Sequence, residues 1–265
     1  MFMYSEEHKR YLKKQKTRNI LIYSFQILLL FIIILVWELL AKYEIINPFI
    51  SSSPSRIVNT IVGLYNANNL FIHIWTTIYE TLISFSLGTI IGIVIATFLW
   101  RFDFIYRVLD PYLTIINSLP KVAIGPIIII YFGANIKSII IMALLISVIV
   151  TIITVYNGFI STDKNRINLL KSFKASKYQI FKMAVLPSSY PTIISSLKIN
   201  ISMTLIGVIM GEFLVSKKGI GYLITYGSQV FNLNLVISGI IILLIVSYLM
   251  YLVVSYIEKI LIKKD

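Results

Sequence analysis

Long apolar runs, separated by short polar segments, dominate the chain. Each run approaches the roughly 20 residues that a helix needs to cross about 30 Å of hydrocarbon. Ionisable residues are crowded into the segments between the runs. We therefore predict an all-α integral membrane protein with six membrane-spanning helices. The predicted spans are Ile20–Leu40, Thr76–Trp100, Tyr112–Phe132, Ser138–Phe159, Thr192–Leu214 and Leu233–Ile257.

The third run is unusual because it contains Pro120, Lys121, Gly125 and Pro126. Membrane helices tolerate Pro and Gly where neighbouring helices or a cavity satisfy the freed backbone groups. The run is therefore predicted as one span.

Lys and Arg are distributed unevenly between the two sets of connections. One set carries seventeen of them and the alternate set five. The rich set is Met1–Asn19, Arg101–Pro111, Ile160–Pro191 and the segment after Ile257; the poor set is Ala41–Trp75, Gly133–Lys137 and Val215–Asn232. Because Lys and Arg are retained on the cytoplasmic side, both termini are predicted to be cytoplasmic, in a cell-membrane protein. The predicted parts are a basic N-terminus (1–19), the span domain (20–259) and a tail (260–265).

Composition agrees with this class of protein. Hydrophobic residues make up 58% of the 265 and charged residues 13%, with a mean hydropathy of +0.87, which is far from a soluble domain. The net charge of +13 follows from the retained Lys and Arg, and no basic recognition motif indicates a nucleic-acid partner. With no cysteine and two isolated histidines, no metal site is predicted.

Two connections carry helical patterns of their own. After a turn-rich stretch, Ile57, Ile61, Leu64 and Tyr65 recur at helical spacing, which predicts a short amphipathic helix beside the membrane. The connection 160–191 also has helical signals.

In the 160–191 loop, Asp163 is placed to cap one helix, and Ser176 with Gln179 forms a capping-box pattern that opens a second. The second helix is predicted to run through Val185 and to stop at Pro187. Its apolar residues, with Phe173 before them, need to be buried. Either they pack on the chain's own helix ends, or they dock into a partner's groove.

The segment Leu170–Pro191, LKSFKASKYQIFKMAVLPSSYP, resembles the cytoplasmic signature loop of binding-protein-dependent ABC importer permeases, which docks on the ATPase subunit. WELLAKYEIINPFISSSPSRIV, LDPYLTIINSLPKVAIGPIIIIYFGANIKS and GEFLVSKKGIGYLI are similar, in the same order, to segments of the nitrate, sulfonate and taurine branch of that family. The resemblance covers roughly Trp37 to Lys259.

The resemblance implies a type I ABC importer permease fold whose spans form the translocation pathway for a small, anionic or heteroaromatic solute. It further implies separate ATPase subunits that bind ATP and Mg, an extracytoplasmic solute-binding protein and a second permease copy in a homodimer. The ATPase-coupling residues that it implies are Leu170, Phe173, Lys174, Ala175, Ser176, Phe181, Leu186 and Pro187.

The chain departs from the family pattern in places. Family loops usually open with Glu-Ala-Ala, where this chain has Asn168, Leu169 and Leu170, and they carry Gly where it has Lys174. A left-handed turn costs a Lys roughly 1 kcal/mol more than a Gly, so a differently shaped break is expected. Glu80 falls where the family tends to have Arg.

No catalytic chemistry is evident in the chain. It lacks a G-x-x-x-x-G-K-[ST] phosphate loop, and the stretch Ser216–Gly219 lacks the required glycine spacing. No nucleophile, paired-carboxylate or metal-ligand pattern occurs either. The chain is therefore predicted not to be an enzyme and to bind no cofactor itself.

Polar residues inside spans are the candidates for the translocation pathway, because they are costly there. The candidates are Glu80, Asn117, Ser118, Lys121, Asn200 and Glu212, and Lys198 is a further ionisable residue within a span. The alternative for the ionisable ones is a span end from which the side chain reaches water, and for Asn117, Ser118 and Asn200 it is hydrogen bonding between helices. Gly88 and Gly92 are predicted to permit close helix approach.

Two other classes of protein remain to be separated from this interpretation. A secondary transporter or channel is expected to show charged relay residues in several spans or an inverted repeat with broken helices. A membrane scaffold would need no transport partners. Co-purification of an ATPase distinguishes both from an importer permease.

Overall fold

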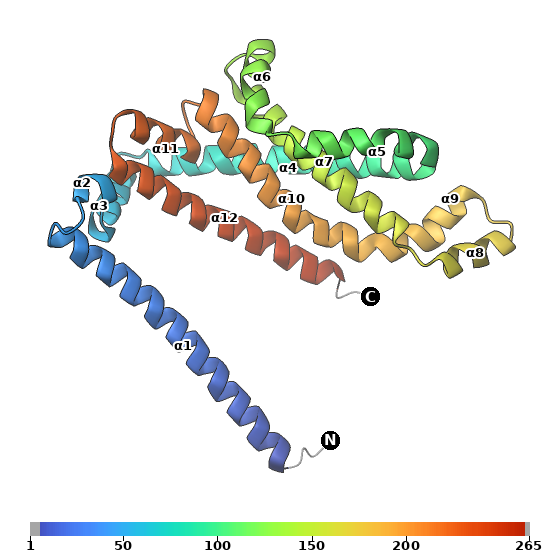
Figure 1. The fold of residues 1–265 in the computed structure, drawn as a ribbon, viewed down its shortest axis with the longest axis horizontal. Helices are drawn as coiled ribbons and strands as arrows, with labels where there is room; N and C mark the ends of the chain where they lie inside the picture. Colours follow the sequence, from blue (N-terminus) through green and yellow to red (C-terminus); the bar gives the residue numbers. More distant parts are fainter. Residues whose placement is uncertain (1–5, 263–265) are drawn as a thin grey trace.

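The computed structural model describes residues 6–262, and every element in that range is helical (Figure 1). Five helices are long and apolar enough to span a membrane, and they confirm five of the predicted spans. They are α1 (Glu6–Lys42), α4 (Leu70–Arg101), α7 (Ile136–Ile160), α10 (Leu186–Val215) and α12 (Leu233–Ile262). Residues 1–5 and 263–265, the outer parts of the predicted terminal segments, lie outside the described residues.

The predicted third span is interrupted by a break, and its two helices together form one bent span, which gives up to six spans in the described residues. Helix α5 (Asp103–Ser118) is followed by a 3-10 turn η1 (Lys121–Ile124) and by α6 (Gly125–Phe132), and the two arms are bent by 89°. The cause is Pro120, which cannot donate a helical hydrogen bond and disfavours the helical conformation of the residue before it. Leu119 is accordingly extended, with φ −65° and ψ 137°.

Helix α7 lies between α4 and α10, and small residues let the three helices approach closely. A Cβ atom added at Gly92 would lie 2.5 Å from Cβ of Thr151 on α7, and one added at Gly88 would clash with Ser147. On the other side of α7, a Cβ at Gly207 of α10 would lie 2.5 Å from Cα of Ala143. The predicted close approach at Gly88 and Gly92 is therefore confirmed.

Helix α1 leans away from the other spans and meets them at α2 (Pro48–Ser51) and α3 (Pro54–Asn66) (Figure 1). Helix α3 is the predicted amphipathic helix; it begins at the N-cap Ser53 and buries Ile57. A hydrogen bond joins the first turn of α3 to α1: the backbone N–H of Ser55 donates to the Glu38 carboxylate at 2.9 Å.

Helix α11 (Ile220–Gln229) was not predicted from the sequence. It lies in the segment between α10 and α12 and packs against both. Ile220 is fully buried with Leu70, Ile242 and Val246. The segment 215–232 is therefore a folded cap on the bundle.

The 160–191 loop forms α8 (Lys164–Ser172), α9 (Lys177–Ile180) and the π-helical turn η2 (Phe181–Val185). Both predicted caps are confirmed. Asp163 accepts from the backbone N–H of Asn165 at 2.8 Å, and Ser176 and Gln179 make both bonds of the capping box, at 2.7 and 3.3 Å.

Pro187 does not end the second helix, contrary to prediction. It lies in the first turn of α10, and one helical path runs from Lys177 to Val215. The wide π turn just before it shifts the carbonyls that the proline ring would meet in a regular α-helix, so the path continues.

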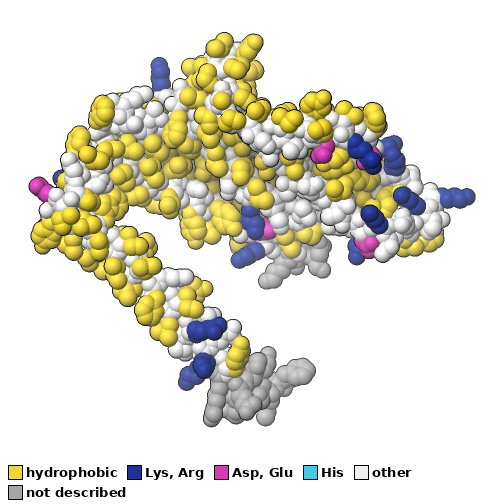
Figure 2. Space-filling model, in the orientation of Figure 1, with side chains coloured by type: hydrophobic (Ala, Val, Ile, Leu, Met, Phe, Trp, Pro, Cys, Tyr) yellow, Lys and Arg dark blue, Asp and Glu magenta, His cyan; other side chains and the backbone are white. Residues whose placement is uncertain are grey.

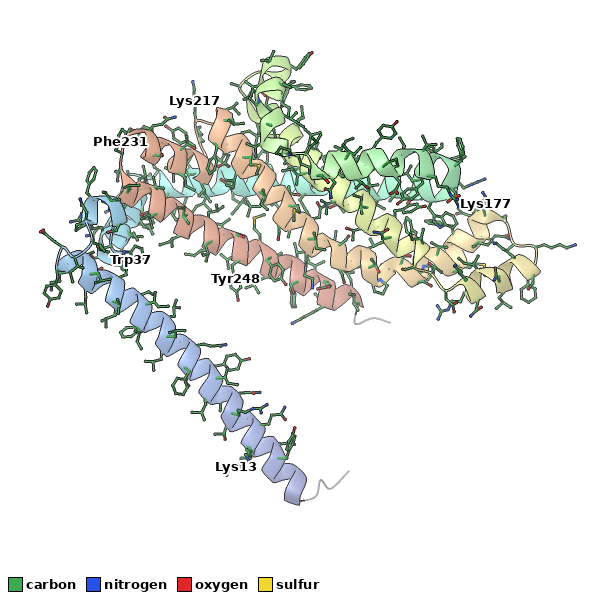
Figure 3. All side chains as sticks on the ribbon, in the orientation of Figure 1. Lys13, Trp37, Lys177, Lys217, Phe231 and Tyr248 are labelled. Atoms are coloured by element: carbon green, nitrogen blue, oxygen red, sulfur yellow. The ribbon has the colours of Figure 1, made fainter. Side chains whose placement is uncertain are left out.

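The two ends of the bundle differ in charge. Lys and Arg gather where α8, α9 and the start of α5 lie, and again near the start of α1, whereas the flanks are largely hydrophobic (Figure 2). Lys177 and Lys217 mark opposite ends of the bundle in Figure 3. This distribution supports the predicted orientation, which stays a prediction.

Candidate functional site: the 160–191 loop and a buried glutamate cluster

The 160–191 loop has one exposed face and one buried face. Phe173 and Tyr178 are 76% and 70% exposed, which is extreme for aromatic side chains. Among the other predicted coupling residues, Lys174, Ser176, Leu186 and Pro187 are exposed, and Leu170 and Ala175 are partly covered.

Phe181 belongs to the buried face. Its ring centroid lies 4.9 Å from that of Trp100 on α4 and 5.4 Å from that of Phe159 on α7. Ile180 and Val185 are buried in the same core. Of the two alternatives for the apolar residues, packing within the chain applies to these three, whereas Phe173 and Tyr178 remain exposed and available to a partner.

The break between α8 and α9 is a left-handed turn at Lys174, with φ +55°. The backbone N–H of Lys174 donates to Lys171 at 2.8 Å and that of Ala175 to Leu170 at 3.0 Å, the two bonds of a Schellman motif. The expected different shape is thus not found: the lysine takes the conformation that a glycine would take, at a cost of roughly 1 kcal/mol.

At the opposite end, Glu212 of α10 is buried, with 1% of its surface exposed. Its carboxylate accepts from Thr77 Oγ1 of α4 at 2.6 Å and from the backbone N–H of Gly221. Thr77 Oγ1 in turn accepts from the backbone N–H of Ile220 at 2.8 Å. One carboxylate and one hydroxyl therefore join α4, α10 and the first turn of α11.

Glu80 and His73, one turn to either side of Thr77, complete what we call the glutamate cluster. Glu80 is 2% exposed, and its buried Oε2 has no hydrogen-bond partner among the described residues. Nδ1 of His73 accepts from the backbone N–H of Gly219 at 3.1 Å. Because both acids are buried, the alternative that they reach water at span ends is wrong.

Gly219 is required by this arrangement. Its φ of +105° and ψ of 166° lie in a region that only glycine occupies readily. A Cβ atom there would lie 2.3 Å from the Glu212 carboxyl carbon, and one at Gly221 would lie 2.8 Å from Oε2. The glycines let the backbone approach the buried carboxylate.

Two other candidates join helices within the bundle. Nδ2 of Asn200 donates to Thr89 Oγ1 at 2.6 Å, which ties α10 to α4 and matches the packing alternative. Lys198 pairs with Glu258 of α12 at 2.7 Å, and Ser195 Oγ donates to the same carboxylate at 2.9 Å.

The remaining candidates lie together at the break between α5 and α6. Asn117 and Ser118 are exposed, and Lys121 Nζ donates to the Asn117 carbonyl at 2.7 Å. Ser118 Oγ donates to the Thr114 carbonyl at 3.0 Å. The structure thus groups the candidates into the glutamate cluster, two interhelical contacts and the break.

Sequence reasoning missed His73, Thr77 and the two glycines around Ile220. The only local signal was the Gly219-Ile220-Gly221 pattern seven residues after Glu212. A pair of glycines flanking one apolar residue indicates close backbone approach, but it does not tell which side chain the backbone approaches.

The long apolar helices and the protruding helical loop define a multi-span membrane protein. Residues 88–263 match the family described as "Binding-protein-dependent transport system inner membrane component", and the chain belongs to that family. It is therefore a permease subunit of an ABC importer, and the ATPase of such an importer is a separate subunit.

Curated relatives span most of the chain. A probable ABC transporter permease protein of Haemophilus influenzae is 26% identical over 230 residues, covering 87% of this chain and 93% of that protein. The putative aliphatic sulfonates transport permease protein SsuC of Bacillus subtilis is 26% identical over 232 residues, covering 88% and 84%. The formylaminopyrimidine transport permease protein ThiX of Halalkalibacterium halodurans is 27% identical over 190 residues, covering 72% and 75%.

Among solved structures, the MetNI methionine ABC transporter in an inward-facing conformation has the same fold. It aligns with a TM-score of 0.63 at 17% identity, covering 71% of this chain and 94% of that chain.

Proposed function

We propose that two copies of this chain form the pathway for a small, anionic or heteroaromatic solute, and that a separate ATPase docks on the exposed face of the 160–191 loop. ATP and Mg bind to the ATPase, and a solute-binding protein delivers the solute at the end where α11 lies. Relatives named for sulfonates and for formylaminopyrimidine support this solute class.

One observation carries the ATPase proposal: Phe173 and Tyr178 are exposed at the tip of a loop that is otherwise capped and anchored. Exposed aromatic residues next to Lys171, Lys174 and Lys177 fit a protein partner, because aromatic anchors supply much of the binding energy at interfaces. The loop's base is rigid, so a displacement of the partner is passed to α10.

The second copy is supported by α5 and α6. None of the α5 side chains is fully buried, although Ile105, Tyr106 and Leu113 pack partly on the core, and Ile130 and Tyr131 of the projecting α6 are each 80% exposed. A projecting helical arm with a break at its base needs protein or water around its freed backbone groups, since lipid cannot satisfy them.

The test is co-purification in detergent of the chain with its cognate ABC ATPase. Wild type should retain the ATPase, and Phe173→Asp should lose it, because truncating an interface anchor commonly costs 2 kcal/mol or more, about thirtyfold in affinity. Lys164→Asp, at the exposed start of α8, is the matched control and should retain it. A complex that keeps the ATPase with both Phe173→Asp and Tyr178→Asp would contradict docking at this face, and wild type that retains no ATPase would contradict docking on the 160–191 loop.

The orientation can be tested directly because the chain has no cysteine. Asn66→Cys and Asn232→Cys should react with an impermeant thiol reagent in intact cells, and Asn168→Cys should react only after the cells are opened. The physical reason is the seventeen-to-five asymmetry of Lys and Arg. Labelling of Asn168→Cys from outside would reverse the orientation and remove the ATPase proposal.

A further inference from the structure

The break between α5 and α6 places polar groups where a membrane protein can least tolerate them. The predicted span begins at Tyr112, so in a span that starts at the membrane surface Leu119 and Pro120 lie about 10–12 Å further along, within the hydrocarbon layer. Broken backbone at that depth occurs where it is buried in protein or lines a water-filled cavity.

Lys121 is an uncompensated cation at this break. The ion pairs among the described side chains, 11–262, are Arg107 with Asp103 and Lys198 with Glu258, so no carboxylate within that part of the chain pairs with Lys121. Its Nζ donates one hydrogen bond, to the Asn117 carbonyl, and an ammonium group has three protons to donate. Two of them remain available.

Lys198, the other lysine within a span, differs from Lys121 because it forms an ion pair that joins two helices. Lys198 has a carboxylate at 2.7 Å that is held by a second hydrogen bond from Ser195. Lys121 has only a backbone carbonyl at the same distance. Beside it, the exposed side-chain amide of Asn117 makes no hydrogen bond with any described residue. The break therefore holds the positive charge of Lys121 without a paired carboxylate, and beside it the Asn117 amide donors without acceptors among the described residues.

We propose that the break is an oxyanion-binding site on the solute pathway, in which Lys121 supplies the charge and Asn117 a neutral donor. In two copies of the chain, each copy contributes one such lysine, so the site favours sulfonate, carboxylate or nitrate groups over cations. This inference rests on the proposed pathway between two copies, and it attributes the preference for anionic solutes to Lys121 and Asn117. An ammonium point charge suits an oxyanion that is passed on, because its hydrogen bonds are not fixed in one plane.

The experiment uses a reporter thiol and needs no knowledge of the natural solute. Ser118→Cys puts one thiol in a chain that has none, next to Lys121. The permease–ATPase complex in lipid nanodiscs is treated with the anionic 2-sulfonatoethyl or the cationic 2-(trimethylammonio)ethyl methanethiosulfonate. Each rate is divided by the rate with free 2-mercaptoethanol.

In the Ser118→Cys protein, the normalised rate with the anionic reagent should exceed that with the cationic reagent. Adding Lys121→Gln should lower the ratio of the anionic to the cationic rate about tenfold, because one nearby charge attracts one reagent and repels the other. Lys121→Arg should preserve the ratio. Lys137→Gln, at the start of α7, is the matched control and should leave it unchanged.

Either of two results would overturn the proposal. A thiol that reacts with neither reagent would place the break against lipid or packed protein. A ratio that is the same with Lys121 and with Gln would show that another group neutralises the lysine. Retention of the ATPase by each variant is measured on the same samples, so a failure of the ATPase proposal is seen separately from a failure of the oxyanion site.

Discussion

Phe181→Asp is expected to abolish ATP-dependent uptake and to detach the ATPase, even though Phe181 belongs to the buried face of the loop. The ring packs against Trp100 and Phe159 but is only partly buried, so its removal costs about 2–3 kcal/mol, less than a fully buried Phe. The new carboxylate adds the cost of desolvating a charge without a partner. The base of the 160–191 loop should then separate from α4 and α7, while the apolar spans still insert. Blots of the membrane fraction measure insertion, co-purification measures ATPase association, and vesicle assays measure ATP-dependent uptake.

Two variants separate this internal role from direct docking. Phe181→Leu keeps an apolar side chain and should retain most ATPase association. Tyr178→Asp, at an exposed position, should weaken association but leave the protease resistance of the loop unchanged. Ala175→Asp, which would place a charge against the same core, should resemble Phe181→Asp. Full uptake by Phe181→Asp would mean that the loop does not couple the two proteins.

Gly219→Ala is expected to disrupt the glutamate cluster and to reduce uptake strongly. Backbone strain at φ +105° costs about 1–3 kcal/mol for a residue with a side chain, and the added Cβ would overlap the Glu212 carboxyl group at 2.3 Å. The first turn of α11 should move away, which breaks the bonds to Thr77, Glu212 and His73. The thermal melting of the detergent-purified permease should fall by several degrees.

Gly63→Ala provides the matched control for this substitution. Gly63 is inside α3, and no atom outside its own helix lies within 4 Å of a Cβ added there. Alanine is the better helix former by about 0.5–1 kcal/mol, so this variant should melt at the same temperature or higher. If both variants melted and transported like wild type, the close approach of Gly219 to Glu212 would be irrelevant to the permease.

Local signals in the sequence were sufficient for much of the fold. Five spans follow from apolar length alone, and the caps at Asp163 and Ser176 follow from hydrogen bonds between residues two or three apart. The break at Pro120 was not predicted because a proline in a span can be tolerated or can end a helix, and the neighbouring structure decides which. The same ambiguity produced the wrong stop at Pro187.

The candidate site was harder to predict because its contacts are long-range. Thr77 and Glu212 are 135 residues apart, and nothing near Thr77 distinguishes it from other hydroxyl residues in spans. Phe173 and Phe181 have the same side chain within one short loop, yet the first is exposed and the second packs on Trp100. Only the path of the chain between them separates a surface residue from a core residue.

Helix α10 continues from the base of the 160–191 loop to the glutamate cluster, so the two regions share one long helix (Figure 1). Its 30 residues are about 45 Å long, with the loop at one end and Glu212 near the other. A tilt of about 5° around the loop end moves the far end through about 4 Å, somewhat less than the pitch of one helical turn. A small rotation at the loop is therefore converted by the length of the helix into a displacement comparable with the size of a small solute, while the hydrogen bonds of the helix stay intact.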